Sequence, residues 1–279
     1  MSPRAVSRGT TPRKTPRTDG LSRYLAERWR GIGLSLVVVV ATLWLGATGQ
    51  LGLYIHPRYF IFTTVMAGLG LVFVVASFAF RTRPADESRP AGRPTGDRTT
   101  AGRRALALGG SAALLTFAAV AVLGLPPATL TSATAIQREV NSGGLDSEAA
   151  AEEAADLVGT GDYDRLSVKE WVSLLAQSED PALYADKTAS ITGFVLPDAA
   201  DPDNVFYVAR FVVTCCAVDA QPIGVAVYQP GWQASYDTDD WVQVSGTFMS
   251  NPSSRSADSL AVLPTTIEPV DQPSDPYVY

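Results

Sequence analysis

The sequence predicts a membrane α-helical N-terminal part with three spans, followed by an all-β C-terminal domain, an OB-like five-stranded barrel preceded by one helix. Three long uncharged segments lie within residues 31–125. Beyond Pro181 the apolar residues recur with a period of two, which is typical of strands. The charge is also divided. Residues 1–125 carry 16 Lys/Arg against 5 Asp/Glu, and residues 126–279 carry 6 against 23, so a single soluble core is not expected.

Each uncharged segment is long enough to cross a hydrocarbon core of roughly 30 Å, for which about 20 apolar residues suffice. The segments are residues 31–55, 59–80 and 105–125. The turn His56-Pro57-Arg58 separates the first two, and its proline predicts a hairpin over residues 31–80. A secretory signal peptide is the alternative for the first segment, but this segment is too long and begins too late.

Basic residues set the predicted orientation in the membrane. Residues 1–30 hold eight Lys/Arg and the 81–104 loop holds seven Arg, whereas the hairpin turn holds only Arg58. We therefore predict a multi-pass plasma-membrane protein with a cytoplasmic N-terminus and an extracytoplasmic C-terminal domain. Both basic segments are predicted to be disordered and to lie near membrane lipid. The acidic exported half argues against a nucleic-acid partner.

The exported half begins with an acidic spacer over residues 126–165, in which residues 148–158 are compatible with one short helix. A folded domain is expected over residues 166–279. Within it, Ser167 and Glu170 fit a capping box, which predicts a helix over 168–178. Five strand-like runs follow, at 188–195, 205–215, 223–228, 241–248 and 260–267. Five strands favour an OB-like barrel, because the alternative immunoglobulin-like sandwich needs seven.

Two adjacent cysteines, Cys215 and Cys216, end the second predicted strand. In an extended strand they would point to opposite faces, but a turn through residues 217–219 would let both sulfurs face one point. Three states stay open: two buried thiols, a strained vicinal disulfide, or a dithiol that binds a soft metal ion or metalloid. Asp219 is the candidate third ligand, although an Asp in a turn is often only a turn residue. The candidate metal site is therefore Cys215, Cys216 and Asp219.

Other polar groups are weaker candidates. His56 would suit a proton or a headgroup, but a polar hairpin turn explains it more simply. Asp237, Asp239 and Asp240 would bind calcium only if further ligands converged on them, so a solvated turn is the better interpretation. Gly193 and Gly246 interrupt predicted strands where a barrel bends. The sequence has no Gly-rich phosphate loop with Lys, and its single His lies outside the exported half, so we expect no enzyme.

Four segments together resemble the YcgQ-like family of bacterial membrane proteins, which are described as permease subunits. The segments are Tyr-Ile-His-Pro-Arg at 54–58, Ile-Thr-Gly-Phe-Val at 191–195, Arg-Phe-Val-Val-Thr-Cys-Cys-Ala-Val-Asp-Ala at 210–220 and Trp-Val-Gln-Val-Ser-Gly-Thr-Phe at 241–248. The resemblance implies a partner, a polytopic permease of the YcgR or YraQ type. Relatives of such permeases include exporters of metals or methylated arsenic.

The leading hypothesis is a non-enzymatic accessory subunit of a membrane permease or efflux system. Its exported β domain would bind a thiophilic metal or metalloid through the vicinal cysteine pair, with no particular ion specified. One alternative is an extracytoplasmic thiol redox protein, although the motif lacks the two intervening residues and the helix N-terminus of the usual redox sites. Another is an envelope scaffold or binding module with structural cysteines.

Overall fold

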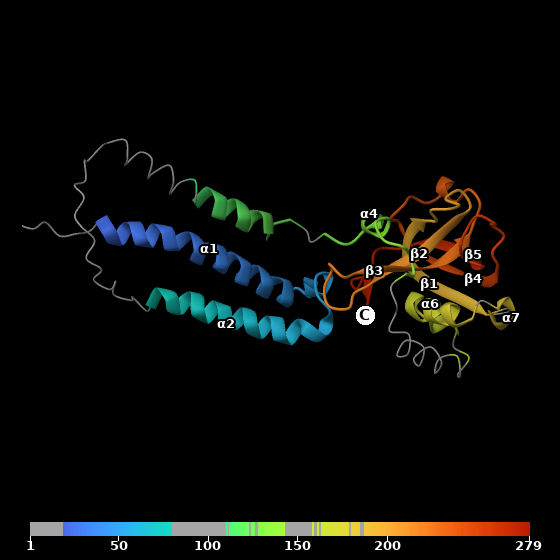
Figure 1. The fold of residues 1–279 in the computed structure, drawn as a ribbon, viewed down its shortest axis with the longest axis horizontal. Helices are drawn as coiled ribbons and strands as arrows, with labels where there is room; N and C mark the ends of the chain where they lie inside the picture. The colour runs from blue at the N-terminus through green and yellow to red at the C-terminus, as the bar shows by residue number, and fades with distance from the viewer. Residues whose placement is uncertain are drawn as a thin grey trace, which may run out of the picture. The chain divides into compact units, whose positions relative to one another are not determined.

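The computed structural model describes residues 19–79, 112–122, 128–142, 163–178, 180–184 and 187–279, and single residues 110, 124, 125, 158 and 161. The chain, drawn as a ribbon in Figure 1, divides into two compact units. One comprises Met1–Trp44 and Val65–Pro126, and the other comprises Leu45–Thr64 and Pro127–Tyr279. The 81–104 loop, residues 1–18 of the tail and all but Val158 of the predicted 148–158 helix lie outside the described residues.

The three-span prediction is wrong for the part of the chain that the structure describes. There, one helix is long and apolar enough to cross a membrane, over Pro57–Ser77. It contains most of α2 (Phe60–Ala79). The other two apolar helices, Gly31–Ala47 and Ala112–Val122, are shorter.

The first uncharged segment falls short because its helix ends early. Helix α1 (Asp19–Ala47) stops before Gly49, which has a left-handed conformation with φ 75°. The apolar part over Gly31–Ala47 rises roughly 25 Å at about 1.5 Å per residue, less than a hydrocarbon core of roughly 30 Å. The composition of a segment does not show where its helix ends. In addition, α1 begins at Asp19, within the segment for which the sequence predicts disorder.

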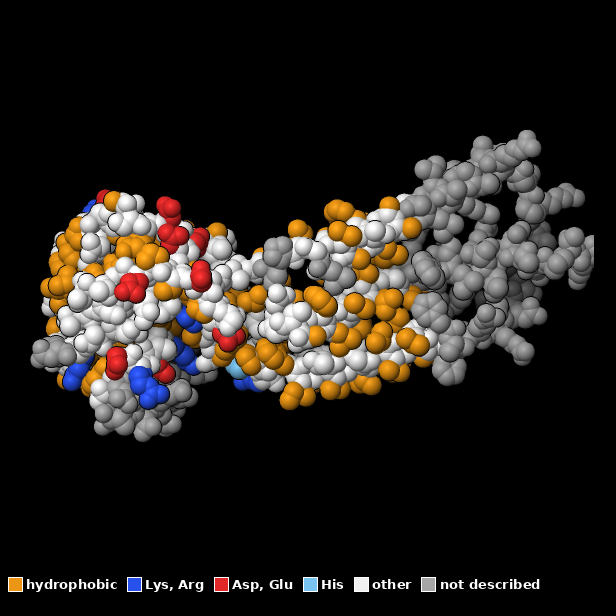
Figure 2. All heavy atoms as spheres, turned by 180° about the vertical axis from the view of Figure 1, so that it is seen from behind, with side chains coloured by type: hydrophobic (Ala, Val, Ile, Leu, Met, Phe, Trp, Pro, Cys, Tyr) orange, Lys and Arg blue, Asp and Glu red, His pale blue; other side chains and the backbone are white. Residues whose placement is uncertain are grey.

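Helix α2 exposes large apolar side chains along its length. Ile61 is 81% exposed and Phe73 is 72% exposed. Hydrophobic side chains cover much of the helical surface in Figure 2. An exposed apolar surface of this kind marks a site of contact with membrane or protein.

The C-terminal domain is built on a six-stranded sheet in the order β1-β4-β5-β3-β2-β6. Three neighbouring pairs are antiparallel, β1–β4, β4–β5 and β2–β3, whereas β3–β5 and β2–β6 are parallel. The end of β1 also pairs with β2, antiparallel. The strands are β1 (Thr188–Pro197), β2 (Val205–Val212), β3 (Gln221–Tyr228), β4 (Trp241–Ser250), β5 (Leu260–Pro269) and β6 (Tyr277–Val278).

The predicted five-stranded OB-like barrel is therefore wrong, because the sheet has six strands and is mixed. The strand that the prediction lacks, β6, has two residues and is too short to show any hydrophobic period. The parallel β3–β5 pair consists of Val227 opposite Val262, and only tertiary packing brings these residues together. The five predicted runs do fall on strands, but β2 ends at Val212, before the cysteines.

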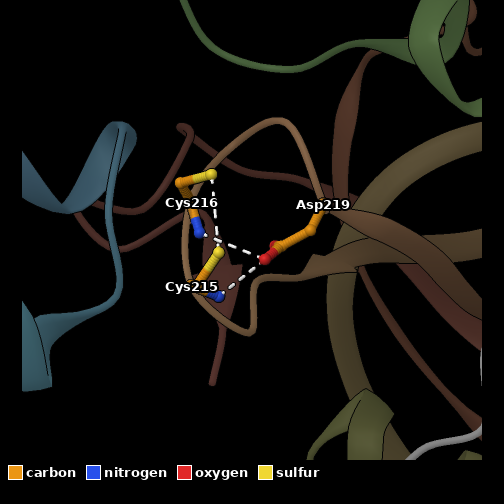
Figure 3. Close-up of side chains that lie close together, drawn as sticks. All are labelled: Cys215, Cys216 and Asp219. Carbon is orange, nitrogen blue, oxygen red and sulfur yellow. Dashed lines mark hydrogen bonds between the residues drawn. The ribbon is translucent and has the colours of Figure 1, made fainter.

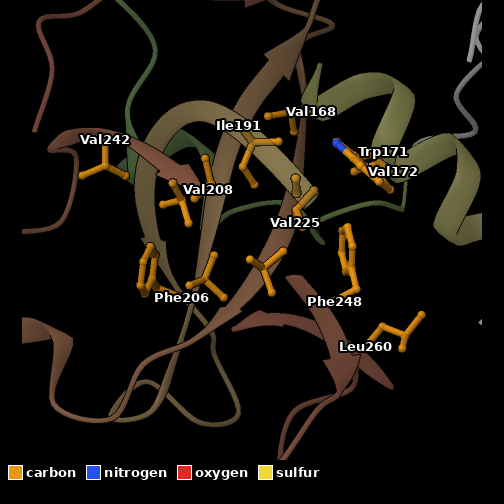
Figure 4. Packing of buried hydrophobic residues seen from close by; sticks show 14 of the residues in the cluster. Val168, Trp171, Val172, Ile191, Phe206, Val208, Val225, Val242, Phe248 and Leu260 are labelled. Carbon is orange, nitrogen blue, oxygen red and sulfur yellow. The ribbon is translucent and has the colours of Figure 1, made fainter. Parts of the chain in front are cut away.

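The predicted helix at 168–178 is confirmed as α6 (Val168–Gln177). The backbone N–H of Ser167 donates to the Glu170 carboxylate, and both hydrogen bonds of the capping box are present. The apolar face of α6 buries Trp171, whose ring lies 4.7 Å from that of Phe248 on β4 (Figure 4). The other short helices are η1 (Gln50–Leu53), η2 (Pro57–Tyr59), α4 (Ser132–Ala135), η3 (Tyr163–Arg165), α7 (Pro181–Tyr184) and η4 (Trp232–Ala234).

A second apolar cluster anchors the end of β2. The rings of Phe194 and Phe211 stack at 5.4 Å, and Tyr277 contacts Phe211 edge-on. The buried Val213 donates its N–H to the Val278 carbonyl at 3.0 Å, which continues the β2–β6 pairing. The connection that carries the cysteines therefore leaves the sheet from a well-packed point.

Candidate functional site

The two cysteines lie in the connection between β2 and β3, residues 213–220, which we call the thiol loop. Because β2 has already ended, Cys215 and Cys216 do not alternate across a strand, and their sulfurs lie 3.6 Å apart (Figure 3). Both are free thiols; Cys215 is exposed and Cys216 is partly buried. The structure thus brings both sulfurs to one point, and it contradicts the interpretation of two buried thiols.

Asp219 holds the backbone of the thiol loop. Its carboxylate accepts hydrogen bonds from the N–H groups of Thr214 at 3.2 Å, Cys215 at 2.8 Å and Cys216 at 3.3 Å. Candidate ligand atoms of the two cysteines and Asp219 all lie within 4.8 Å of one another. A carboxylate has about four lone-pair sites, so Asp219 can accept one further hydrogen bond, and the Cys215 thiol supplies it. The three residues that the sequence singles out are therefore adjacent, and Asp219 also has a structural role.

The contact between thiol and carboxylate shifts the pKa values of both groups. The hydrogen bond to Asp219, with smaller effects from Cys216 and from burial, raises the pKa of Cys215 to about 12. Desolvation raises the pKa of Asp219, but hydrogen bonds from the Cys215 thiol and from the loop N–H groups outweigh it, so this pKa is lowered. At neutral pH the loop therefore holds a protonated Cys215 beside an ionised carboxylate.

The turn between α1 and α2 contacts the thiol loop directly, and both belong to the same compact unit. Ile55 and Cys216 form an isolated antiparallel β-bridge. The N–H of His56 donates to the Cys215 carbonyl at 3.0 Å, and the N–H of Ala217 donates to the Tyr54 carbonyl at 2.8 Å. Two segments that are far apart in the sequence are thus paired through their backbones at the cysteines.

Side chains extend this contact. The Arg58 guanidinium donates to the Thr214 carbonyl at 2.6 Å. The Tyr279 hydroxyl donates to the Gly52 carbonyl at 3.0 Å, and its ring lies 5.0 Å from that of His56. His56 Nδ1 accepts the N–H of Arg58 at 3.1 Å, as the N-cap of η2. This agrees with the interpretation of His56 as a turn residue, although its place beside the cysteines was not predicted.

Further cations lie around the thiol loop and the turn. Arg138 donates to the Val218 carbonyl at 2.9 Å, and Lys169 donates to the Tyr279 carbonyl at 2.6 Å. Sequence reasoning missed both cations, as well as the roles of Arg58 and Tyr279. No local motif connects such distant residues. The available signal was that the 54–58 and 210–220 segments both carry the family resemblance.

The three aspartates before β4 have local structural roles. Asp239, with φ 74°, accepts the N–H of Ser132 at 2.6 Å and its hydroxyl at 2.8 Å. Asp240 accepts the N–H of Asp237 at 2.8 Å. Among the residues that the structure describes, the group of three or more convergent ligands is that of the thiol loop. These aspartates therefore stabilise a turn, and Asp239 also binds the start of α4.

Comparison with known families finds a match for the C-terminal domain only. Residues 148–279 match the family model described as DUF1980 C-terminal domain. Searches of curated proteins and of solved structures gave no significant match. The matched range contains all six strands and the thiol loop, but not the turn over residues 54–58. The similarity supports a DUF1980-type family for this part of the chain.

Proposed function

We propose that this chain is a non-enzymatic, membrane-anchored accessory subunit whose C-terminal domain binds a soft metal ion or metalloid through Cys215 and Cys216. The observation that carries the proposal is the 3.6 Å separation of two free sulfurs. Two thiolates bound to one tetrahedral ion at about 2.3 Å each lie roughly 3.8 Å apart. The sulfurs therefore approach a chelating separation before an ion binds.

The chemistry of binding follows from the donor set. Two S–H bonds break, two sulfur–metal bonds form, and two protons pass to solvent, with no change of oxidation state. Thiolates favour soft ions over magnesium or calcium. Asp219 lies close enough to accept a thiol proton or to supply an oxygen ligand.

The redox alternative has less support. Redox cysteines have a lowered thiol pKa, usually at a helix N-terminus or beside a cation. The pKa of Cys215 is instead raised to about 12, and the thiol loop joins two strands rather than preceding a helix. The exposure of Cys215 similarly weighs against a scaffold with buried structural cysteines.

We further propose that α2 crosses the membrane and that the C-terminal domain is extracytoplasmic. The thiol loop contacts the turn at the N-terminal end of α2, whereas the basic 81–104 segment follows its C-terminal end. Basic segments favour the cytoplasmic side. The domain and the basic segment would therefore lie on opposite sides of the membrane.

The partner that we propose is a polytopic permease of the YcgR or YraQ type. The support is the resemblance of the 54–58 and 210–220 segments, together with the absence of ionisable residues from α2, which leaves it without the usual lining of a transport path. Affinity purification from native membranes in mild detergent should recover a multi-span permease. Repeated recovery of the chain alone would contradict this assignment.

Cadmium titration of the reduced full chain tests the binding site. We expect one equivalent of Cd²⁺ per chain, followed by thiolate-to-cadmium charge-transfer absorption in the ultraviolet. Cys215→Ser and Cys216→Ser should each remove the band, whereas Ser250→Ala, which changes an exposed hydroxyl on β4, should keep it. A reduced wild-type protein that takes up no cadmium would exclude the proposed site.

A further inference from the structure

The thiol loop is held from two sides by different parts of the chain. On one side, Asp219 pairs with N–H groups of the loop. On the other side, His56 and Arg58 donate to the carbonyls of Cys215 and Thr214. The position of the two sulfurs therefore depends on the turn that precedes α2 as well as on the domain that carries the cysteines.

We propose that the turn over residues 54–58 is part of the dithiol site, and that ion binding by Cys215 and Cys216 is coupled to docking of this turn, with Arg58 as a positioning residue. The inference rests on the proposed function, since it concerns the same pair of thiols. It extends that site from the C-terminal domain to the turn at the N-terminal end of the candidate membrane helix.

The coupling follows from preorganisation. With the turn docked, the carbonyls of Thr214 and Cys215 and the N–H of Ala217 are all paired. Without the turn, these groups lose those partners and the loop gains conformational freedom, which chelation must then remove. The coupling is reciprocal: the factor by which docking strengthens ion binding equals the factor by which a bound ion stabilises docking.

Arg58 offers the clearest way to test this contact. Its hydrogen bond to the Thr214 carbonyl comes from a side chain, so one substitution removes it, whereas the bonds of Tyr54 and His56 to the loop are between backbones. The guanidinium carbon also lies 5.1 Å from the centre of the Tyr59 ring. Arg58 thus links the loop to Tyr59, the last residue of η2, without being a candidate ligand itself.

The consequence for function concerns the membrane end of the protein. Turn residues 54–58 lead through η2 directly into α2. Any ion that tightens the loop–turn contact will also stabilise the start of this helix. Ion binding by the thiols would in this way stabilise the start of α2, the helix that we expect a membrane partner to contact.

The experiment compares cadmium affinity of the full chain in detergent for wild type, Arg58→Ala and Arg58→Lys. We expect Arg58→Ala to weaken binding by about 5- to 50-fold, within the usual range of coupling between sites, and Arg58→Lys to restore part of the loss. The control is Arg255→Gln, which removes an arginine paired with Asp201 and should leave affinity unchanged.

Hydrogen exchange gives the reciprocal measurement. Cadmium should slow exchange of the His56 and Ala217 amides in wild type, and less so in Arg58→Ala. Equal affinities together with unchanged exchange would overturn the coupling and leave the metal site standing. If wild type binds no cadmium, both the proposed function and this inference are overturned. Should Arg58→Ala fail to fold, wild-type exchange and the affinity of Arg58→Lys decide the question.

Discussion

Asp219 has two roles in the thiol loop. It pairs with three backbone N–H groups of the thiol loop, and it accepts the hydrogen bond that does most to raise the pKa of Cys215. The first task fixes the loop, and the second keeps a solvent-exposed cysteine protonated. An exposed thiol with a raised pKa reacts slowly with electrophiles but still exchanges its proton for a soft ion.

The replacement Asp219→Asn should make Cys215 more reactive. In wild type, the rate of alkylation by iodoacetamide should stay low near pH 8 and rise only toward pH 12, because the thiolate is the nucleophile and the pKa of Cys215 is about 12. The amide removes the negative charge and the carboxylate acceptor, so the thiol pKa falls and the rate at about pH 8 increases. Tandem mass spectrometry assigns the modified cysteine. Identical pH–rate profiles would show that Asp219 does not control the thiol.

Short elements of the C-terminal domain owe their positions to local contacts. The capping box starts α6, which then buries Trp171 against the sheet. In β4, the register with β5 shifts between Ser245 and Gly246, next to the carbonyl of Leu263. Both features are visible in the sequence, as the Ser167–Glu170 spacing and as a glycine within a strand.

Removal of the helix cap should destabilise the domain measurably. Ser167→Ala leaves the first turn of α6 without its side-chain acceptor, and we expect the free energy of unfolding to fall by about 1 kcal/mol. Denaturation of the purified protein by urea, followed by the fluorescence of tryptophan, measures the change. Glu170→Gln keeps an acceptor for the Ser167 N–H and should cost less. Unchanged stability of Ser167→Ala would contradict the role of the Ser167 side chain as the helix cap.

Gly246 should not tolerate a side chain. A Cβ at this position would collide with the Leu263 carbonyl oxygen and the Pro264 Cα, so β4 and β5 would have to separate. We expect Gly246→Ala to lower the free energy of unfolding by about 1–3 kcal/mol, the usual cost of overpacking. The neighbouring exposed Thr247 provides the control, because Thr247→Ala changes no buried contact. Similar stability of both variants would mean that the strands adjust freely.

The second compact unit contains both the turn between α1 and α2 and the C-terminal domain. Backbone hydrogen bonds and the Arg58 side chain connect the two. The turn that the domain contacts leads into the N-terminal end of α2, and the basic 81–104 segment follows the C-terminal end of α2 in the sequence. This arrangement yields a prediction of topology.

Reporter fusions measure that topology. A periplasmic-type reporter fused after Tyr279 should be active outside the cytoplasm, and one inserted near Gly96 should be inactive there, because the seven arginines of the 81–104 loop favour the cytoplasmic side. A cytoplasmic reporter at the same two positions should give the opposite pattern. Cytoplasmic activity after Tyr279 would overturn the exported location of the thiol loop.

Features that depend only on neighbouring residues could be predicted from the sequence. The capping box at Ser167 and Glu170 required only a spacing of three, and the strand runs required only a period of two. Cys215, Cys216 and Asp219 lie within five positions, so one turn was enough to bring their ligand atoms together. Each of these features arises from local backbone geometry, which a short stretch of sequence specifies.

The remaining features depend on contacts between distant segments, which a local pattern in the sequence does not reveal. The two-residue β6 joins the sheet, and Arg58 and Tyr279 reach the thiol loop and its turn. These contacts join residues that are far apart along the chain, and their energy depends on the packing of both partners. Hydrophobic periodicity and composition describe local stretches of the chain and do not indicate which distant residues come into contact. The sequence therefore identified the thiols but not the turn that holds them.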